Sequence, residues 1–229
     1  MTEIMIKSDD GTQFSGYLAE PGSGPAPGIV VLQEIFGVNS AMRSIAEDLA
    51  HKGYLALVPD LFWRQEPNLQ LSDKTDWDRA LELYQGFDED AGIRDARAAL
   101  AQLRALSACS GKAGAIGYCL GGKLAYLMAT RSDSDCAVSY YGVGIENALG
   151  EAENIDRPFL LHVAEDDDFV PAEAQTKVAD ALAKNRWVNR YSYPGVGHAF
   201  ARPAGEHYDI AAATIANQRT TEFLALHLG

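Results

Sequence analysis

A glycine-rich hexapeptide, Gly117-Tyr118-Cys119-Leu120-Gly121-Gly122, separates a short apolar segment from a segment with helical character. Residues 113–117 predict a strand and residues 121–130 predict a helix, so the hexapeptide is a tight turn between the two. Small residues are required two positions on either side of Cys119, because such a turn has no room for larger side chains. The turn would display the sulfur beside a helix N-terminus, whose dipole favours a thiolate. The pattern predicts a nucleophilic cysteine; the alternative is a buried structural cysteine in a glycine-rich turn.

The rest of the chain alternates between apolar segments and helical ones. Continuous apolar runs such as Ile29-Val30-Val31-Leu32 are typical of strands that are covered on both faces. Strands are predicted at residues 29–32, 54–58, 113–117, 137–141, 159–163 and 187–193, and helices at residues 40–52, 121–130, 172–184 and 208–226, with two more between residues 74 and 106 that meet near Gly86 or Gly92. This alternation predicts an α/β fold, with a mostly parallel central sheet and helices on both faces.

Length and composition favour a single domain over residues 1–229. The chain is 47% hydrophobic and 22% charged, as in ordinary globular proteins. Its breaker-rich segment, residues 21–28, is typical of a surface turn rather than of a linker. The N-terminus has no secretory pattern, and no run of about 18 apolar residues occurs. We therefore expect a cytoplasmic protein without a membrane partner; the oligomeric state stays open, with a monomer as the simplest expectation.

Charge and cysteine content exclude further classes of function. The formal net charge of −13 argues against a nucleic-acid partner, which would need a basic patch. An anionic substrate would have to be held by local arginines against this overall charge. The three cysteines have an irregular spacing that fits neither a disulfide framework nor a zinc site. No metal ion or organic cofactor is expected.

Two more loops that follow predicted strands carry polar groups suited to catalysis. Ligands of such sheets bind beyond the carboxyl ends of the strands. The segment after residues 159–163 contains Asp166, Asp167 and Asp168, any of which could orient a catalytic histidine while the others form a solvated turn. Of the five histidines, only His198 falls in a glycine-containing loop directly after a predicted strand. The chain order of nucleophile, acid and histidine is that of the α/β-hydrolase fold.

With these motifs in place, the chain resembles the dienelactone hydrolase family over nearly its whole length. The segments that carry the resemblance are 33–39 (QEIFGVN), 59–61 (PDL), 117–122 (GYCLGG), 140–144 (YYGVG), 169–172 (FVPA) and 197–202 (GHAFAR). In that family the acid of the triad stands three residues before the Val-Pro pair, which selects Asp167. The resemblance implies an α/β-hydrolase enzyme that opens esters or lactones with Cys119, His198 and Asp167.

The resemblance also implies roles for residues near the first long strand. Glu34 matches a family glutamate that holds the resting cysteine as a thiol and takes its proton when substrate arrives. A carboxylate close to a sulfur disfavours the thiolate, which is the physical basis of this role. An ordinary helix-capping glutamate is the alternative. The backbone N–H groups of Leu120 and Ile35 would form the oxyanion hole.

Substrate recognition is the third implication of the resemblance. Arg202 matches a family arginine that binds the substrate carboxylate, a task for which a bidentate guanidinium is suited; a surface arginine is the alternative. A second such arginine falls on either Arg79 or Trp77, because the segment around them is shorter than in other members. Phe36 and Tyr84 are candidates to line the pocket, although helix packing would explain both equally well.

The expected reaction is hydrolysis of a carboxylate-bearing enol lactone, the dienelactone class formed when chlorinated catechols are degraded. The substrate would be a small anionic lactone or ester. A general carboxylesterase of the same family, a redox-active thiol protein and a silent binding module are the alternatives. The absence of a resolving cysteine close to Cys119 disfavours the redox alternative.

Overall fold

The computed structural model describes residues 2–22 and 24–229, which belong to two compact units, Met1–Ala115 and Ile116–Gly229. In chain order the first unit contains β1 (Thr2–Lys7), β2 (Gln13–Ala19), β3 (Ala26–Leu32), α1 (Ser40–His51), β4 (Leu55–Pro59), α2 (Trp77–Gln85), α3 (Glu89–Ala105) and most of β5 (Cys109–Tyr118). β1 pairs antiparallel with β2 and β2 antiparallel with β4, while β4 and β3 are parallel.

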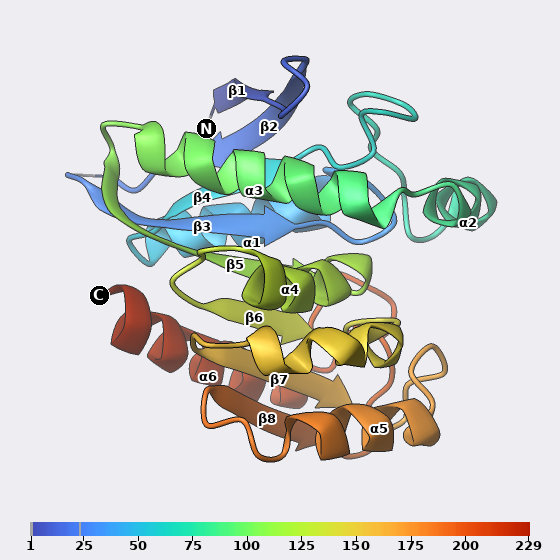
Figure 1. Ribbon diagram of the computed structural model, residues 1–229. Helices are drawn as coiled ribbons and strands as arrows, with labels where there is room; N and C mark the ends of the chain where they lie inside the picture. The colour runs from blue at the N-terminus through green and yellow to red at the C-terminus, as the bar shows by residue number, and fades with distance from the viewer. Residues whose placement is uncertain (1, 23) are drawn as a thin grey trace. The chain divides into compact units, whose positions relative to one another are not determined.

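Helices cover both faces of the strands in the first unit. Figure 1 shows α3 on one face of β3 and β4 and α1 on the other. The Asn39 side chain caps α1 by accepting a hydrogen bond from the Met42 N–H at 3.2 Å. The apolar face of α1 then buries Met42, Ile45 and Leu49. Every residue of β4 is buried, which explains its continuous apolar sequence.

The second unit is a parallel arrangement of three strands with helices on both faces. It contains α4 (Leu120–Arg131), β6 (Ala137–Tyr140), the 3₁₀ segment η1 (Ile145–Asn154), β7 (Phe159–Ala164), α5 (Ala172–Leu182), β8 (Val188–Tyr193) and α6 (Ile210–Leu228). β6 pairs with β7 and β7 with β8, both in parallel. In Figure 1, α4, η1 and α5 lie on one face of these strands and α6 lies on the other. The carboxyl ends of the three strands consequently meet at one edge.

The predicted alternation of strands and helices is confirmed, with differences at several boundaries. β5 begins at Cys109 instead of residue 113, because its first four residues are polar or exposed and leave no apolar run in the sequence. Gly86 ends α2, whereas Gly92 lies inside α3. β1 and η1 were not predicted. β1 pairs with β2 at the edge of the first unit, and most of its residues are exposed.

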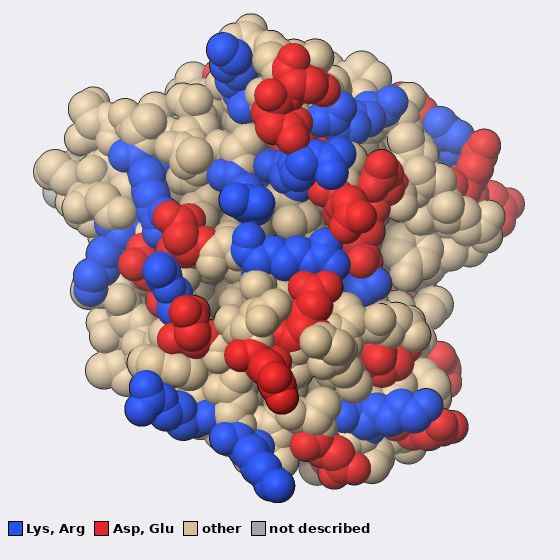
Figure 2. Space-filling model, viewed as in Figure 1, with Lys and Arg blue, Asp and Glu red and all other residues tan. Residues whose placement is uncertain are grey.

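Surface charge is mixed on the face shown in Figure 2. Lysine and arginine side chains are interspersed there with aspartate and glutamate side chains. Exposed pairs of this kind contribute about 0–1 kcal/mol each to stability. None of the helices in residues 2–22 and 24–229 is long and apolar enough to cross a membrane.

Candidate active site

Cys119 occupies a strained turn between β5 and α4. Its φ of +57° and ψ of −115° fall outside the regions that non-glycine residues favour. The Cys119 N–H donates to the Tyr140 carbonyl at 3.1 Å, and the Cys119 carbonyl accepts from the Val143 N–H at 3.3 Å. Backbone strain of this kind costs about 1–3 kcal/mol and persists where the surrounding structure fixes it. Here the end of β6 and the residues after it fix the turn.

Two glycines of the hexapeptide are required by close backbone approach. A Cβ added to Gly117 would lie 1.8 Å from the Gly121 carbonyl oxygen. A Cβ added to Gly122 would lie 2.6 Å from the Tyr140 carbonyl oxygen. No side chain fits at either position without moving the backbone. The local sequence thus determines a turn in which Cys119 precedes the first residue of a largely buried helix.

Asp167 lies in an acid loop, defined here as residues 164–170, after β7. Its side chain is 1% exposed, whereas Asp166 and Asp168 are exposed residues. One carboxylate oxygen, Oδ1, accepts from the Phe169 N–H at 2.9 Å. The other, Oδ2, lies 2.8 Å from Nδ1 of His198. Of the three adjacent aspartates, Asp167 is therefore the one that meets the histidine.

His198 lies in a histidine loop, residues 194–200, after β8. Two backbone hydrogen bonds join the end of β8 and the histidine loop to the acid loop. The Glu165 N–H donates to the Tyr193 carbonyl and the Asp166 N–H donates to the Val196 carbonyl, both at 3.1 Å. The Asp167–His198 contact therefore rests on a backbone framework and does not depend on the two side chains alone.

Two aromatic rings hold the imidazole of His198 edge-on. The centroid of the Tyr141 ring lies 5.0 Å from that of His198, and the centroid of the Phe169 ring lies 4.8 Å from it. His198 itself is 8% exposed. Neither aromatic residue was singled out from the sequence, although both belong to segments that carry the family resemblance. A φ of +39° at Tyr141, directly after β6, turns the chain at this point.

The charge state of His198 depends on its two neighbours. Burial lowers the pKa of His198, but the charge of Cys119 and the hydrogen bond that His198 donates to the Asp167 carboxylate outweigh burial and raise the pKa to about 10. A protonated imidazole is thus favoured when Cys119 carries a negative charge. Cys119, His198 and Asp167 form one interacting group in the second unit. Such a group can generate a nucleophile and deliver a proton.

Arg202 follows the histidine loop and is 5% exposed. The backbone N–H of Arg202 donates to the Ala199 carbonyl at 2.9 Å, and the backbone carbonyl of Arg202 accepts from the Gly205 N–H at 3.1 Å. These bonds form two consecutive turns. An arginine at the surface would be largely solvated, so the burial of Arg202 disfavours the alternative of an ordinary surface residue.

Leu120, a predicted donor of the oxyanion hole, is the first residue of α4 in the second unit, and the other remaining predicted site residues lie in the first unit. Glu34, Ile35 and Phe36 are 1%, 5% and 1% exposed and follow β3 directly. The Phe36 carbonyl accepts from the Leu71 N–H at 2.9 Å, which ties this segment to a loop between β4 and α2. The Trp77 ring packs edge-on against Phe36, with a centroid distance of 5.1 Å.

The two candidates for the second substrate clamp differ in their surroundings. Arg79 is 41% exposed and forms ion pairs with Glu66 and Glu82, so its guanidinium already has two carboxylate partners. Trp77 instead contacts Phe36. Tyr84 is half-buried on α2. The structure therefore brings Trp77 into contact with Phe36, whereas the guanidinium of Arg79 binds two glutamates.

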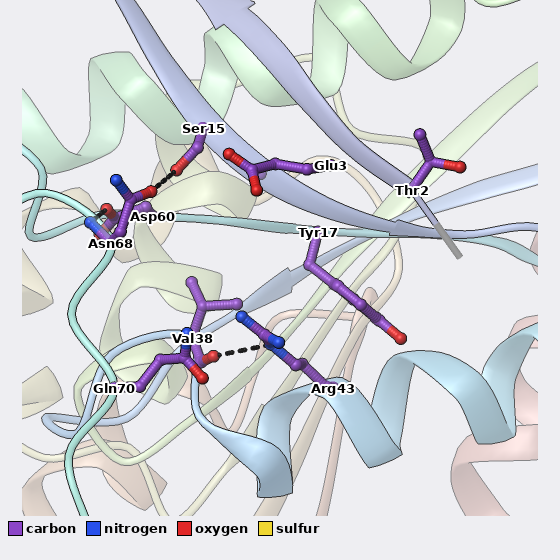
Figure 3. Close-up of a pocket in the computed structure, with 10 residues that line it drawn as sticks. Thr2, Glu3, Ser15, Tyr17, Val38, Arg43, Asp60, Asn68 and Gln70 are labelled. Atoms are coloured by element: carbon purple, nitrogen blue, oxygen red, sulfur yellow. Dashed lines mark hydrogen bonds between the residues drawn. The ribbon is translucent and has the colours of Figure 1, made fainter.

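A polar pocket of about 360 Å³ lies within the first unit and contains none of the predicted site residues. Figure 3 shows the guanidinium of Arg43 beside Val38 and the ring of Tyr17. The Arg43 Nε donates to the Val38 carbonyl at 3.1 Å, and its guanidinium carbon lies 5.2 Å from the Tyr17 ring centroid. The lining also includes the carboxylates of Glu3 and Asp60. None of the residues that line this pocket is a cysteine or a histidine, so the pocket lacks the residue types that the sequence predicts for catalysis.

Comparison with known proteins decides the family. A model of the dienelactone hydrolase family matches residues 14–228. The chain belongs to this family. It is 40% identical to carboxymethylenebutenolidase 1 of Cupriavidus pinatubonensis, covering 97% of this chain and 96% of that protein. It is 41% identical to the carboxymethylenebutenolidase of Pseudomonas knackmussii, over 97% of this chain and 95% of the relative.

Solved structures confirm the predicted α/β-hydrolase fold. A dienelactone hydrolase-like promiscuous phosphotriesterase from metagenomic libraries is 27% identical, with a TM-score of 0.84 over 100% of this chain and 99% of the other. An esterase of Pyrococcus furiosus shares the fold at 17% identity, with a TM-score of 0.76 over 100% of this chain and 93% of the other. The predicted enzyme class is also confirmed: the chain is a hydrolase of the dienelactone hydrolase family, and its relatives are named carboxymethylenebutenolidases.

Proposed function

We propose that Cys119, His198 and Asp167 are the catalytic triad of a hydrolase that opens a carboxylate-bearing enol lactone. The observation that supports this most directly is the 2.8 Å contact between Asp167 Oδ2 and His198 Nδ1, with His198 also interacting with Cys119. A buried acid that holds one ring nitrogen fixes the histidine tautomer and leaves the other nitrogen to exchange protons with the nucleophile.

The reaction begins when the Cys119 thiolate attacks the lactone carbonyl. The backbone N–H of Leu120, the first residue of α4, is a donor for the developing oxyanion. Glu34 takes the proton of the Cys119 thiol before this attack, and protonated His198 gives its proton to the enolate oxygen as the ring C–O bond breaks. Water then attacks the thioester and returns a proton to His198, while Glu34 returns its proton to the Cys119 sulfur that leaves, which gives a dicarboxylate. A thiolate attacks well but expels poor leaving groups badly, so an enol lactone suits it.

Glu34 and Ile35 keep the roles that the family motif implies. Ile35 supplies the second oxyanion donor through its backbone N–H, and Glu34 holds the resting thiol protonated. These two assignments rest on the match of residues 33–39 to the family, and on the burial of both side chains.

Arg202 is proposed to bind the substrate carboxylate. Its burial supports this, because a buried guanidinium binds anions more strongly than a solvated one does. The names of two relatives that are 40% and 41% identical also favour a lactone of this class. Trp77 is the better candidate for the second clamp position, since Arg79 is paired with Glu66 and Glu82.

The cellular setting is also part of the proposal. None of the three cysteines forms a disulfide in the part of the chain that the structure describes, and a catalytic thiol suits a reducing compartment, so we propose that the enzyme acts in the cytoplasm. We also propose that residues 1–229 form a single domain.

The test of the proposed substrate is a steady-state assay of cis- and trans-dienelactone against neutral aryl acetates. The proposal requires kcat/KM to be higher for at least one dienelactone than for the neutral esters. A second candidate function is a general esterase, which is favoured by the likeness to a promiscuous dienelactone hydrolase-like enzyme. A preference for neutral esters would support that candidate and contradict the lactone proposal.

A further inference from the structure

Gln175 reaches from α5 back into the acid loop that carries Asp167. The side chain is 8% exposed. Its amide Nε2 lies 3.0 Å from the Ala164 carbonyl, 3.2 Å from the Glu165 carbonyl and 2.8 Å from the Val170 carbonyl. A single side chain thus contacts both ends of the loop.

Hydrogen-bond chemistry shows which end of the Gln175 amide faces these carbonyls. Carbonyl oxygens only accept hydrogen bonds, so the group that faces all three must be the amide NH₂ and not the amide oxygen. Its two hydrogens serve the Val170 carbonyl at the end of the acid loop and the Ala164 and Glu165 carbonyls at its start. No side chain of similar size without a donor can replace these contacts.

Asp167 lies midway between the two ends that Gln175 joins. Its own carbonyl accepts from the Val170 N–H at 3.2 Å, and its Oδ1 accepts from the Phe169 N–H. These bonds give the loop a local turn but do not close its ends. Four consecutive acids, Glu165 to Asp168, repel one another within this turn. A neutral donor that binds both ends opposes the opening that this repulsion favours.

We propose that Gln175 is a positioning residue for catalysis: by joining the ends of the acid loop it holds Asp167 Oδ2 within hydrogen-bond distance of His198. The inference rests on the proposed triad. Gln175 would act through the acid loop and not on the reacting atoms. Loss of its donor leaves Asp167 in place chemically but free to move, and a displacement of about 1 Å in such a group can lower a rate about 100-fold.

The experiment compares Gln175→Met, which matches glutamine in size without a donor, with Thr176→Val as the control. Thr176 is the next residue of α5, is exposed, and its hydroxyl donates to the Ala172 carbonyl within the helix. We expect Gln175→Met to lower kcat about 10- to 100-fold with little change in KM. Thr176→Val should match the parent in both constants.

A second measurement needs no substrate. The proton between His198 Nδ1 and Asp167 should give a downfield NMR signal in the parent, which shifts or broadens in Gln175→Met. A purely structural role in anchoring α5 would lower the melting temperature without moving this signal. Gln175→Asn is the second probe if the methionine variant folds poorly. Its amide donor is too short to reach both ends of the loop, so we expect it to lower kcat, by less than a complete loss of the donor would.

A folded Gln175→Met variant with the parent's kcat and an unchanged His198 signal would overturn the inference. Failure of the proposed function looks different: the parent would then prefer neutral esters or hydrolyse no substrate, whereas the NMR comparison would still report whether Gln175 holds Asp167.

Discussion

Asp167 Oδ2 lies 2.8 Å from His198 Nδ1, and the two residues come from loops that their own backbones join. The hydrogen bonds from Glu165 to Tyr193 and from Asp166 to Val196 set the distance between the loops before either side chain is considered. The backbone therefore brings the two loops together, and the Gln175 amide joins the ends of the acid loop that carries the aspartate. Removal of the aspartate should change the electrostatics and tautomer of His198 while the loops stay in place.

The first prediction follows for Asp167→Asn. An amide at this position can hold the wrong tautomer of the imidazole, and in the serine protease template this change lowers kcat about 10⁴-fold. We expect a loss of roughly 100-fold or more here, with a normal melting temperature. Because the hydrogen bond that His198 donates to Asp167 raises the pKa of His198, an NMR titration should show a lower His198 pKa in the variant. Asp168→Asn, at an exposed neighbour, should change neither quantity.

Cys119 is the subject of the second prediction. Cys119→Ala should abolish hydrolysis while the protein folds normally, because the turn is held by backbone contacts with Tyr140 and Val143. Cys119→Ser should retain little activity, since a hydroxyl is far less acidic than the thiol that the site is built to use. Kinetic assays with circular dichroism check both variants. Retention of about a tenth of the parent's kcat in Cys119→Ala would refute the nucleophile assignment. Cys109→Ser, outside the group, is the matched control.

The elements and loops of this site were predictable because they follow from local rules. The turn at Cys119 needs glycine on both sides, and parallel strands deliver their following loops to one edge. These rules located Cys119 and His198 directly. They left three adjacent aspartates open, and the choice of Asp167 came from the family motif. The structure distinguishes the three by burial, since Asp167 is buried and its two neighbours are exposed. Burial is a property of the folded chain, so the sequence alone did not show it.

Contacts between distant segments account for most of what the sequence did not reveal. Gln175 looks like an ordinary polar helix residue, and only the folded loop places three carbonyls around its amide. Asp95 is similar: it is buried in α3 and accepts hydrogen bonds from Ser8, Trp63 and Arg64, which are far from it in sequence. No local pattern marks either residue. The same holds for β1, whose pairing with β2 depends on a turn and not on an apolar run.

The third prediction concerns stability in acid and rests on His162. This histidine is buried in β7, with Nδ1 2.7 Å from the Tyr193 hydroxyl and Nε2 2.9 Å from the Thr220 hydroxyl. Burial lowers its pKa to about 3. In the unfolded chain its pKa is about 6.5, so between these values the unfolded state binds the extra proton. Stability due to His162 is therefore full above about pH 6.5 and falls as the pH drops toward 3, by about 1.4 kcal/mol per unit.

Urea unfolding between pH 7 and pH 4 tests this sign. His162→Gln should be less stable than the parent at pH 7, because one hydroxyl contact is lost, but should have a shallower decline toward pH 4. His51→Gln, at an exposed position of α1, should decline as steeply as the parent. An equally steep decline in His162→Gln would show that other groups dominate the acid response.

The last prediction separates the lactone proposal from the general esterase. If Arg202 binds the substrate carboxylate, Arg202→Ala should impair anionic lactones far more than neutral aryl acetates. Charge-assisted hydrogen bonds contribute about 1.5–3 kcal/mol, and tenfold corresponds to about 1.4 kcal/mol. The expected loss of kcat/KM is therefore roughly 10- to 150-fold for the anion, with little change for the neutral ester. Arg202→Lys keeps the charge but loses the planar fork, so its loss should be intermediate. Arg79→Ala is the matched control, because Arg79 is already paired with Glu66 and Glu82 and should affect neither substrate. Equal losses on both substrates would assign Arg202 to the support of the histidine loop, and the carboxylate clamp would be rejected while the cysteine hydrolase remained.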